Sequence, residues 1–259
     1  MSWKIFEKEC VTYLTEKYGY LFKLKGTSDS TISDIFFNNG RKQFYIEAKM
    51  PKAQCGQFVL LPNLKNRTFI YSTKNKTKEN ECTKMIIDFM NKRFDYFNSA
   101  GTSGINIEMS KTIFYRWIIS YYKNKGVEFF ITKDKNKFII FPIEQFSKYF
   151  NVTAKYREKK SGSSSLNNSN KADFEYAMDQ TGIEYRFNGL DVVSDSDING
   201  LKVNGNKYDY ILRKNDNTYN VRKLSNTRNA NIIFSIELKC YDINQYQCDK
   251  LEFEKVISN

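Results

Sequence analysis

Apolar and polar positions alternate along the first fifty residues in a way that predicts one helix and three strands. Residues 2–18 carry apolar side chains at helical spacing, and Ser2 stands where the N-cap of such a helix would lie. Residues 20–24 alternate as a short strand. Residues 32–37 and 44–49 are apolar runs joined by Asn-Asn-Gly, which is a hairpin signal. We therefore expect a helix followed by a three-stranded meander.

The middle of the chain continues with helical and strand patterns. An amphipathic helix is predicted over 80–97, which gives the order helix, three strands, helix for the first hundred residues. A further helix is predicted over 110–124. A hairpin follows at 127–132 and 137–141, and Pro142 is placed to begin a short helix.

The C-terminal part differs in composition. Residues 158–172 are rich in Ser, Asn and Lys, as linkers are, and residues 183–239 read as short strands separated by Gly, Asn and Asp turns. We predict a division into residues 1–150 and a β-rich region over residues 151–259. The alternative is that these strands extend the first sheet.

Three charged residues on the predicted hairpin are candidates for a catalytic site. Asp34 precedes the first apolar run, whereas Glu47 and Lys49 end the second. Residues two apart on a strand point to the same face, so Glu47 and Lys49 would face one pocket. The hairpin would bring Asp34 beside Glu47, although twelve residues separate them. Two carboxylates and a lysine on one sheet edge can hold Mg²⁺ and activate a water.

There are two alternatives to a catalytic site at the hairpin. Asp34, Glu47 and Lys49 could be solvent-exposed cross-strand pairs, but Glu47 follows the apolar Phe-Tyr-Ile, and unpaired charges on a buried strand are costly. A second Glu-x-Lys occurs at Glu237 and Lys239, with an acid upstream at Asp209. That separation is long, and an ordinary strand end is the simpler interpretation of the second pair.

The amino-acid composition limits the classes of function that this chain can have. Lysine and arginine exceed aspartate and glutamate by 41 to 29, a net charge of +12, which favours a polyanionic partner such as nucleic acid or an acidic membrane surface. An AT-rich genome would give the same bias. Histidine is absent, which excludes Ser-His-Asp triads, Cys-His proteases and His-ligated metal sites. The five cysteines form no Cys-x-x-Cys pair and fit a reducing cytoplasm, and no apolar run is long enough to cross a membrane.

The order helix–three strands–helix, with Asp34 on the second strand and Glu47-Ala48-Lys49 on the third, resembles the PD-(D/E)XK nuclease superfamily, and within it the type II restriction endonucleases. The resemblance covers roughly residues 1–100. It implies a mixed α/β fold of the restriction-endonuclease type, with a catalytic core in residues 1–150 and a DNA-recognition region in residues 151–259. It also implies that Asp34, Glu47 and the main-chain oxygen of Ala48 ligate Mg²⁺, and that Lys49 orients the attacking water. Ser33 stands where the motif has proline.

The same resemblance suggests further site residues. Members often have a glutamine downstream of Glu-x-Lys, for which Gln57 and Gln54 of the Gln-rich turn expected after Lys49 are candidates. An acid from the first helix sometimes completes the metal site, and Glu7 is the candidate for this further ligand. Basic and polar residues of two C-terminal segments are candidates for phosphate and base contacts, with a flexible linker and a solvated turn as the alternatives. The DNA-binding candidates are Lys155, Arg157, Lys159, Lys160, Ser161, Ser163, Asn167, Arg222, Lys223, Arg228 and Asn229.

We therefore predict a Mg²⁺-dependent type II restriction endonuclease that makes sequence-specific double-strand cuts in DNA. It would act in the cytoplasm as a homodimer, because cutting both strands of a palindrome needs two sites related by a two-fold axis. A cognate DNA methyltransferase would be its functional partner. The alternatives are a repair or structure-specific nuclease with the same core and a non-catalytic DNA-binding protein.

Overall fold

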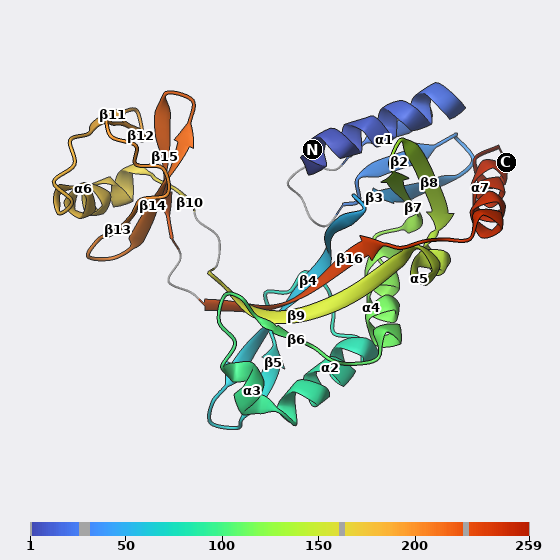
Figure 1. Ribbon diagram of the computed structural model, residues 1–259, viewed down its shortest axis with the longest axis horizontal. Helices are drawn as coiled ribbons and strands as arrows, with labels where there is room; N and C mark the ends of the chain where they lie inside the picture. The colour runs from blue at the N-terminus through green and yellow to red at the C-terminus, as the bar shows by residue number, and fades with distance from the viewer. Residues whose placement is uncertain (1, 26–31, 161–163, 225–227, 259) are drawn as a thin grey trace. The chain divides into compact units, whose positions relative to one another are not determined.

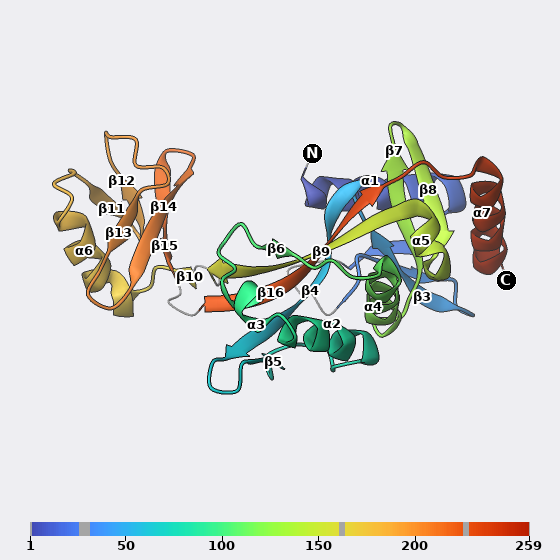
Figure 2. The same ribbon diagram turned by 60° about the horizontal axis from the view of Figure 1, so that its bottom comes forward.

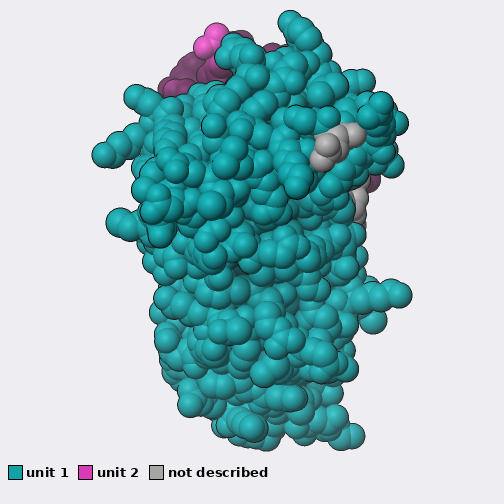
Figure 3. All heavy atoms as spheres, turned by 90° about the vertical axis from the view of Figure 1, so that its right-hand side faces the viewer, with its two compact units in different colours: residues 1–157, 231–259 teal, residues 158–230 magenta. Residues whose placement is uncertain are grey.

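The computed structural model describes residues 2–25, 32–160, 164–224 and 228–258. It divides the chain into two units, coloured separately in Figure 3: unit 1 comprises residues 1–157 and 231–259, and unit 2 comprises residues 158–230. This differs from the expected division at residue 150. The reason is that the last strand of the chain and the C-terminal helix return to unit 1 and contribute to its sheets and its core.

The first sheet of unit 1 holds the predicted hairpins (Figure 1). Its strand order is β1-β2-β3-β7-β8, and only β3 and β7 run parallel to each other. The acid-bearing strand β3 therefore lies in the middle of the sheet, hydrogen-bonded on both sides. The bounds are β1 Phe22–Leu24, β2 Ile35–Asn38, β3 Gln43–Ala48, β7 Val127–Asp134 and β8 Lys137–Pro142.

The predicted β2–β3 hairpin is confirmed. Ile35 pairs with Ile46 and Phe37 with Phe44 in an antiparallel register. The side chain of Asn39 stabilises the turn, because its Oδ1 accepts hydrogen bonds from the main-chain N–H groups of residues 41 and 42. Gly40 has φ +86°, a conformation that glycine adopts without strain. Local turn residues thus set the register that aligns the two strands.

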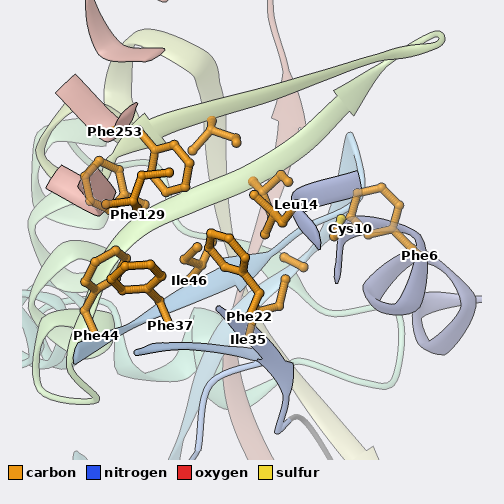
Figure 4. Close-up of a cluster of buried hydrophobic side chains, with 14 residues drawn as sticks. Phe6, Cys10, Leu14, Phe22, Ile35, Phe37, Phe44, Ile46, Phe129 and Phe253 are labelled. Carbon is orange, nitrogen blue, oxygen red and sulfur yellow. The ribbon is translucent and has the colours of Figure 1, made fainter. Parts of the chain in front are cut away.

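Two helices cover one face of this sheet. They are α1, Trp3–Tyr18, and α7, Ile243–Ser258. Figure 4 shows Phe6 and Leu14 of α1 and Phe253 of α7 together with the side chains of β2 and β3 that point the same way. The predicted N-terminal helix is confirmed and Ser2 is its N-cap residue, although its side chain makes no capping hydrogen bond. The sequence pattern did not indicate α7.

Helices α4, Lys111–Lys123, and α5, Phe146–Tyr149, cover the other face (Figure 2). Neighbouring residues of β7 show the alternation: Phe129 contacts Phe253 of α7, whereas Phe130 contacts Tyr122 of α4. The sheet is thus a middle layer with helices on both sides. The helix predicted over 110–124, the hairpin after it and the short helix after Pro142 are confirmed.

A second sheet of unit 1 has the order β5-β4-β16-β9-β6. The Gln-rich turn expected after Lys49 is instead the start of a twelve-residue strand, β4, and β5 was not expected at all. The helix predicted over 80–97 is two helices, α2 and α3, and Asn80 caps the first. The bounds are β4 Lys52–Asn63, β5 Thr68–Tyr71, α2 Glu81–Asn91, α3 Phe94–Asn98, β6 Ile105–Asn106, β9 Phe150–Lys160 and β16 Arg228–Leu238.

Strand β4 carries a bulge at Cys55 and Gly56. In the register with β16, Gln57 pairs with Ile233 but Gln54 pairs with Ser235, so two residues of β4 oppose one of β16. Gly56 has φ +105°, and a Cβ atom there would lie 2.7 Å from a ring carbon of Trp117. The bulge therefore requires glycine both for its backbone and for the close approach of α4.

Unit 2 has its own sheet and core. Its strand order is β11-β12-β15-β14-β13, with β10 paired to β15, and α6 packs on a core that includes Phe174, Tyr210 and Leu212. Residues 158–172 are therefore not simply a linker, because β9, β10, η2 and α6 occupy most of them. The bounds are β10 Ser164–Ser165, η2 Asn168–Asn170, α6 Lys171–Asp179, β11 Arg186–Asn188, β12 Asp191–Val193, β13 Lys202–Asn204, β14 Asp209–Asn215 and β15 Thr218–Lys223.

None of the helices in the described part of the chain is long and apolar enough to cross a lipid bilayer.

The bulge gives a test of the packing between β4 and α4. We expect Gly56→Ala to lower the free energy of unfolding by about 2–6 kcal/mol, because a strained positive φ and an overpacked contact with Trp117 each cost about 1–3 kcal/mol. Gly101→Ala is the matched control, since a Cβ atom there meets nothing within 4 Å. Urea denaturation measures both variants, and equal stabilities would contradict the packing described here.

Candidate active site

Four charged side chains meet at the end of the β2–β3 hairpin. Asp34 immediately precedes β2, Glu47 lies on β3, Lys49 follows β3, and Glu7 comes from α1. Asp34 is 9% exposed and Glu47 is 4% exposed, and Glu7 is also buried. The three residues predicted from the hairpin are therefore together and out of bulk solvent, which excludes the alternative of solvent-exposed surface pairs.

Glu47 and Lys49 form an ion pair, with Lys49 Nζ 2.5 Å from Glu47 Oε1. Their side of the strand follows from the alternation: Ile46 and Ala48 lie in the core beneath α1 and α7, so Glu47 and Lys49 point to the face covered by α4. There Lys49 Nζ lies 5.8 Å from the centroid of the Tyr122 ring. The strand period thus delivers both charges to one side, as the sequence predicted.

Asp34 is held by the strand beside it. The main-chain N–H of Ala48 donates a hydrogen bond of 3.0 Å to Asp34 Oδ2. Because Ile35 pairs with Ile46, the residue before Ile35 lies level with Glu47. The carboxyl group of Glu7 on α1 lies beside that of Asp34 and interacts with it. The three acids therefore come from three elements and are positioned by one register and one main-chain contact.

Burial and mutual repulsion perturb the charges of this group. Burial first, and then Glu47, raises the pKa of Asp34 well above its ordinary value. Burial likewise raises the pKa of Glu7. Burial lowers the pKa of Lys49, but Glu47 and Asp34 outweigh it and hold that pKa above its ordinary value. Lys49 is therefore a cation, and the site carries more negative than positive charge unless a carboxyl group is protonated.

The donor set suits a hard divalent cation. Asp34 and Glu47 offer carboxylate oxygens, and the main-chain oxygen of Ala48 lies on the strand between Glu47 and Lys49. The surplus negative charge of the buried acids favours such a cation. Among the described residues, no group of three or more His, Cys, Asp and Glu side chains has the arrangement of a metal site. Two carboxylates with main-chain and water oxygens are thus the ligand set on offer.

A cavity of about 430 Å³ opens at these residues. Sequence patterns missed several of its lining residues because their segments carry no recognisable motif. Lys125 follows α4, while Lys74 and Lys76 lie after β5, far from the hairpin in sequence. The lining residues include Asp34, Glu47, Lys49, Gln54, Gln57, Lys74, Asn75, Lys76, Tyr121, Tyr122 and Lys125.

The bulge explains the two glutamines. Residues three apart on a regular strand point to opposite faces, but the extra residue at Cys55 and Gly56 puts Gln54 and Gln57 on the same side. Gln54 Nε2 donates a hydrogen bond of 3.0 Å to Gln57 Oε1, and both line the cavity. The structure therefore brings both predicted glutamines to the site, from a strand rather than from a turn.

The second Glu-x-Lys forms no such group. Glu237 is exposed on β16, and its side chain pairs with Lys52 at 3.7 Å. Asp209 belongs to unit 2, whereas Glu237 and Lys239 belong to unit 1. The main-chain N–H of Lys239 donates to the carbonyl of Tyr149, as at an ordinary strand end. The buried acids at the first hairpin are thus the candidate active site.

The residues predicted to contact DNA lie in different local environments. Lys155 is exposed on β9, and Arg157 is half-buried on the same strand. Asn167 caps η2 through its side-chain oxygen, Arg222 Nη1 donates to Ser165 Oγ, and Lys223 Nζ lies 4.0 Å from the Tyr208 ring centroid. The side chains of Lys159, Lys160, Arg228 and Asn229, and all of Ser161 and Ser163, lie outside the described residues.

A solved structure, HhaI endonuclease in complex with DNA, is similar to this chain over its full length. The two sequences are 48% identical, the match covers 100% of each chain, and the TM-score is 0.91. The mixed α/β architecture with three sheets is shared with that endonuclease. The scan of family models and the search of curated proteins each found no match.

The perturbed acid gives a test that needs no DNA. With EDTA present, we expect Asp34→Asn to be more stable than the wild type at neutral pH. Unfolded Asp34 ionises near its ordinary pKa of 3.8, whereas the folded group ionises higher, so wild-type stability falls as pH rises between these two values. The advantage of the variant should vanish near about pH 4 and grow toward about pH 7, as measured by urea denaturation. Asp88→Asn, at an exposed site on α2, is the control.

Proposed function

This chain belongs to the restriction endonuclease family that includes HhaI, and we propose that it makes sequence-specific double-strand cuts in DNA by Mg²⁺-dependent hydrolysis. The chain is a type II restriction endonuclease by this membership. The observation that carries the proposed site is the buried group of Asp34, Glu47 and Lys49 at the floor of the cavity. We propose that phosphodiester hydrolysis takes place there.

We further propose that the first sheet with its flanking helices is a PD-(D/E)XK core. The positions of the motif residues support this proposal. Asp34 immediately precedes β2, and Glu47 and Lys49 lie at the end of its antiparallel partner β3. Helix α1 packs against the same hairpin. The departure at Ser33 leaves this geometry intact. Ser33 is fully buried, so the position is part of the packed entry to β2.

We propose that Asp34, Glu47 and the carbonyl of Ala48 hold Mg²⁺, and that Glu7, which lies beside Asp34, is a further ligand. When bound there, the ion would neutralise charge on the phosphoryl oxygens and polarise a water. The buried acids suit this role because burial, and then their mutual repulsion, raises the pKa of Asp34 in the metal-free protein. A divalent cation would relieve that repulsion, so binding should release protons.

Lys49 has a distinct task in this proposal. Its raised pKa keeps it protonated, so it is a donor and a positive charge rather than a general base. An ammonium group donates to a water oxygen or to a phosphoryl oxygen and stabilises the negative charge that grows in the transition state. Its pairing with Glu47 restrains the flexible side chain before DNA arrives. Gln57 and Gln54 of β4, which also line the cavity, can donate amide N–H groups to the substrate.

Charge is distributed unevenly between the two units, and this bears on DNA binding. Unit 1 holds 30 of the 41 basic residues and 19 of the 29 acidic ones, whereas unit 2 holds 11 and 10. We propose that unit 1 supplies most of the electrostatic attraction to the DNA backbone. Lys155 and Arg157 of β9 belong to this set, and the candidates in unit 2 remain proposed contacts to phosphates or bases.

The remaining parts of the proposal concern the oligomeric state of the enzyme and its context in the cell. Cutting both strands of a palindromic site calls for two catalytic groups, so we propose that the enzyme acts as a homodimer. A DNA methyltransferase of the same specificity would protect the host genome, and both would work in the cytoplasm. A digest of unmethylated phage DNA with Mg²⁺ tests the activity, because discrete fragments indicate site-specific cutting and a smear indicates a non-specific nuclease.

Substitution of the buried group tests the site. We expect Asp34→Asn, Glu47→Gln and Lys49→Ala each to lower the cleavage rate about 10³-fold or more, because loss of several kcal/mol of charge stabilisation changes a rate by that factor. Glu237→Gln, at the second Glu-x-Lys, is the matched control and should cut like the wild type. DNA binding by all four variants is followed by fluorescence anisotropy in EDTA and should persist. Wild-type rates in the first three variants would refute the assignment.

A further inference from the structure

The part of the catalytic cavity outside the buried acids carries lysines that the proposed mechanism does not use. We propose that Lys74 and Lys125 bind backbone phosphates of the DNA strand that enters this cavity, and so position the strand over Asp34 and Glu47. This inference rests on the proposed function, since it assigns a DNA-binding role to the same site. Both lysines line the cavity, but they come from separate segments after β5 and after α4.

The segment with Lys74 is fixed to the strand that carries the two glutamines. Asn75 Oδ1 accepts a hydrogen bond of 2.8 Å from the main-chain N–H of Val59, and Asn75 Nδ2 donates one of 2.9 Å to the carbonyl of the same residue. The N–H of Ser72 also donates to that carbonyl, and the N–H of Lys74 donates to Ser72 Oγ. The main chain at Lys74 is therefore held against β4 before DNA binds.

The same segment is closed at its far end. Tyr71 of β5 donates its hydroxyl to the carbonyl of Thr77 at 2.9 Å. Residues 71–77 thus form a short loop whose two ends are joined by side-chain hydrogen bonds, with Asn75 bonded to β4 between them. A polar loop built with this many internal contacts presents an exposed lysine at a defined place on the cavity wall.

Lys125 is positioned by the strand that carries the acids. The main-chain N–H of Tyr45 on β3 donates 2.9 Å to the carbonyl of Gly126, and the N–H of Lys125 donates to the carbonyl of Tyr122. Lys125 Nζ lies 4.1 Å from the Tyr121 ring centroid and 5.1 Å from that of Tyr122. The two rings support the side chain of Lys125 over the face of the sheet to which Lys49 points.

The chemistry of the two groups favours phosphate over base edges. An ammonium group is a compact point charge on a flexible stem, which suits a phosphate oxygen better than the bidentate edge of a base. Among the described residues, neither Lys74 nor Lys125 forms an ion pair with an acid of the chain. The negative charge of the cavity is buried with Lys49, so these two ammonium groups offer their charge to a ligand.

Salt dependence of DNA binding tests the inference, since each phosphate contact adds about 0.9 to the slope of log K against log salt concentration. The probe is a fluorescein-labelled random-sequence duplex of about 30 base pairs, roughly three helical turns, in EDTA so that no cleavage occurs. We expect Lys74→Ala and Lys125→Ala each to lower the slope by about 1 and to weaken binding about tenfold at low salt. Lys74→Arg and Lys125→Arg should keep the slope of the wild type.

Lys255→Ala is the matched control, because Lys255 is an exposed lysine on α7, on the other side of the sheet from Glu47 and Lys49. It should bind with the wild-type slope. If the slopes of Lys74→Ala and Lys125→Ala equal that of the wild type while Mg²⁺-dependent cutting is intact, the inference fails and the proposed function stands. If the slopes fall as expected but the wild type cuts no DNA, the proposed function fails and the phosphate contacts stand. A wild type that binds no duplex refutes both.

Discussion

The burial of three carboxyl groups with a single ammonium group at one end of a hairpin is the constraint on which this structure depends. Glu7, Asp34 and Glu47 are withdrawn from water, and Lys49 compensates only part of their charge. Desolvation and repulsion then raise the pKa of Asp34. Such an arrangement lowers stability in the metal-free protein, and it persists because the hydrophobic layers on both sides of the sheet hold the strands that carry it. A site so charged is suited to receive a cation rather than to serve as a structural ion pair.

The position of β3 explains how the charges are held in place. It is hydrogen-bonded to β2 on one side and to β7 on the other, and the register with β7 continues to Ala48 at the end of the strand. The N–H of Ala48 donates to Asp34, and the N–H of Lys49 donates to the carbonyl of Ile131 on β7. The main chain at the reactive group is thus fixed from both sides.

Local patterns predicted the parts of this site that depend on neighbouring residues, and failed where distant segments decide. The Asn-Asn-Gly turn and the two-residue period set the hairpin, so Asp34, Glu47 and Lys49 could be paired from the sequence. The expected turn at Gln54 and Gln57 is a bulged strand, because β16 and Trp117 of α4 complete it. Lys125 reaches the cavity through the parallel pairing of β3 with β7, which local periodicity cannot show. The division at residue 150 failed for the same reason, since β16 and α7 return to the first unit after unit 2.

The uneven charge of the two units separates two aspects of DNA binding. Attraction to the backbone scales with positive charge and carries no sequence information, whereas base recognition depends on hydrogen-bonding groups and needs no net charge. Unit 1 holds the charge excess together with the proposed catalytic group, so the proposal assigns both affinity for DNA and hydrolysis to unit 1. Unit 2 is close to electrically balanced, has its own core, and is inserted between β9 and β16, neighbouring strands of the sheet that contains Gln54 and Gln57. Under the proposed function, a nearly neutral unit joined to that sheet would contribute contacts that discriminate among sequences without adding to the affinity for all of them.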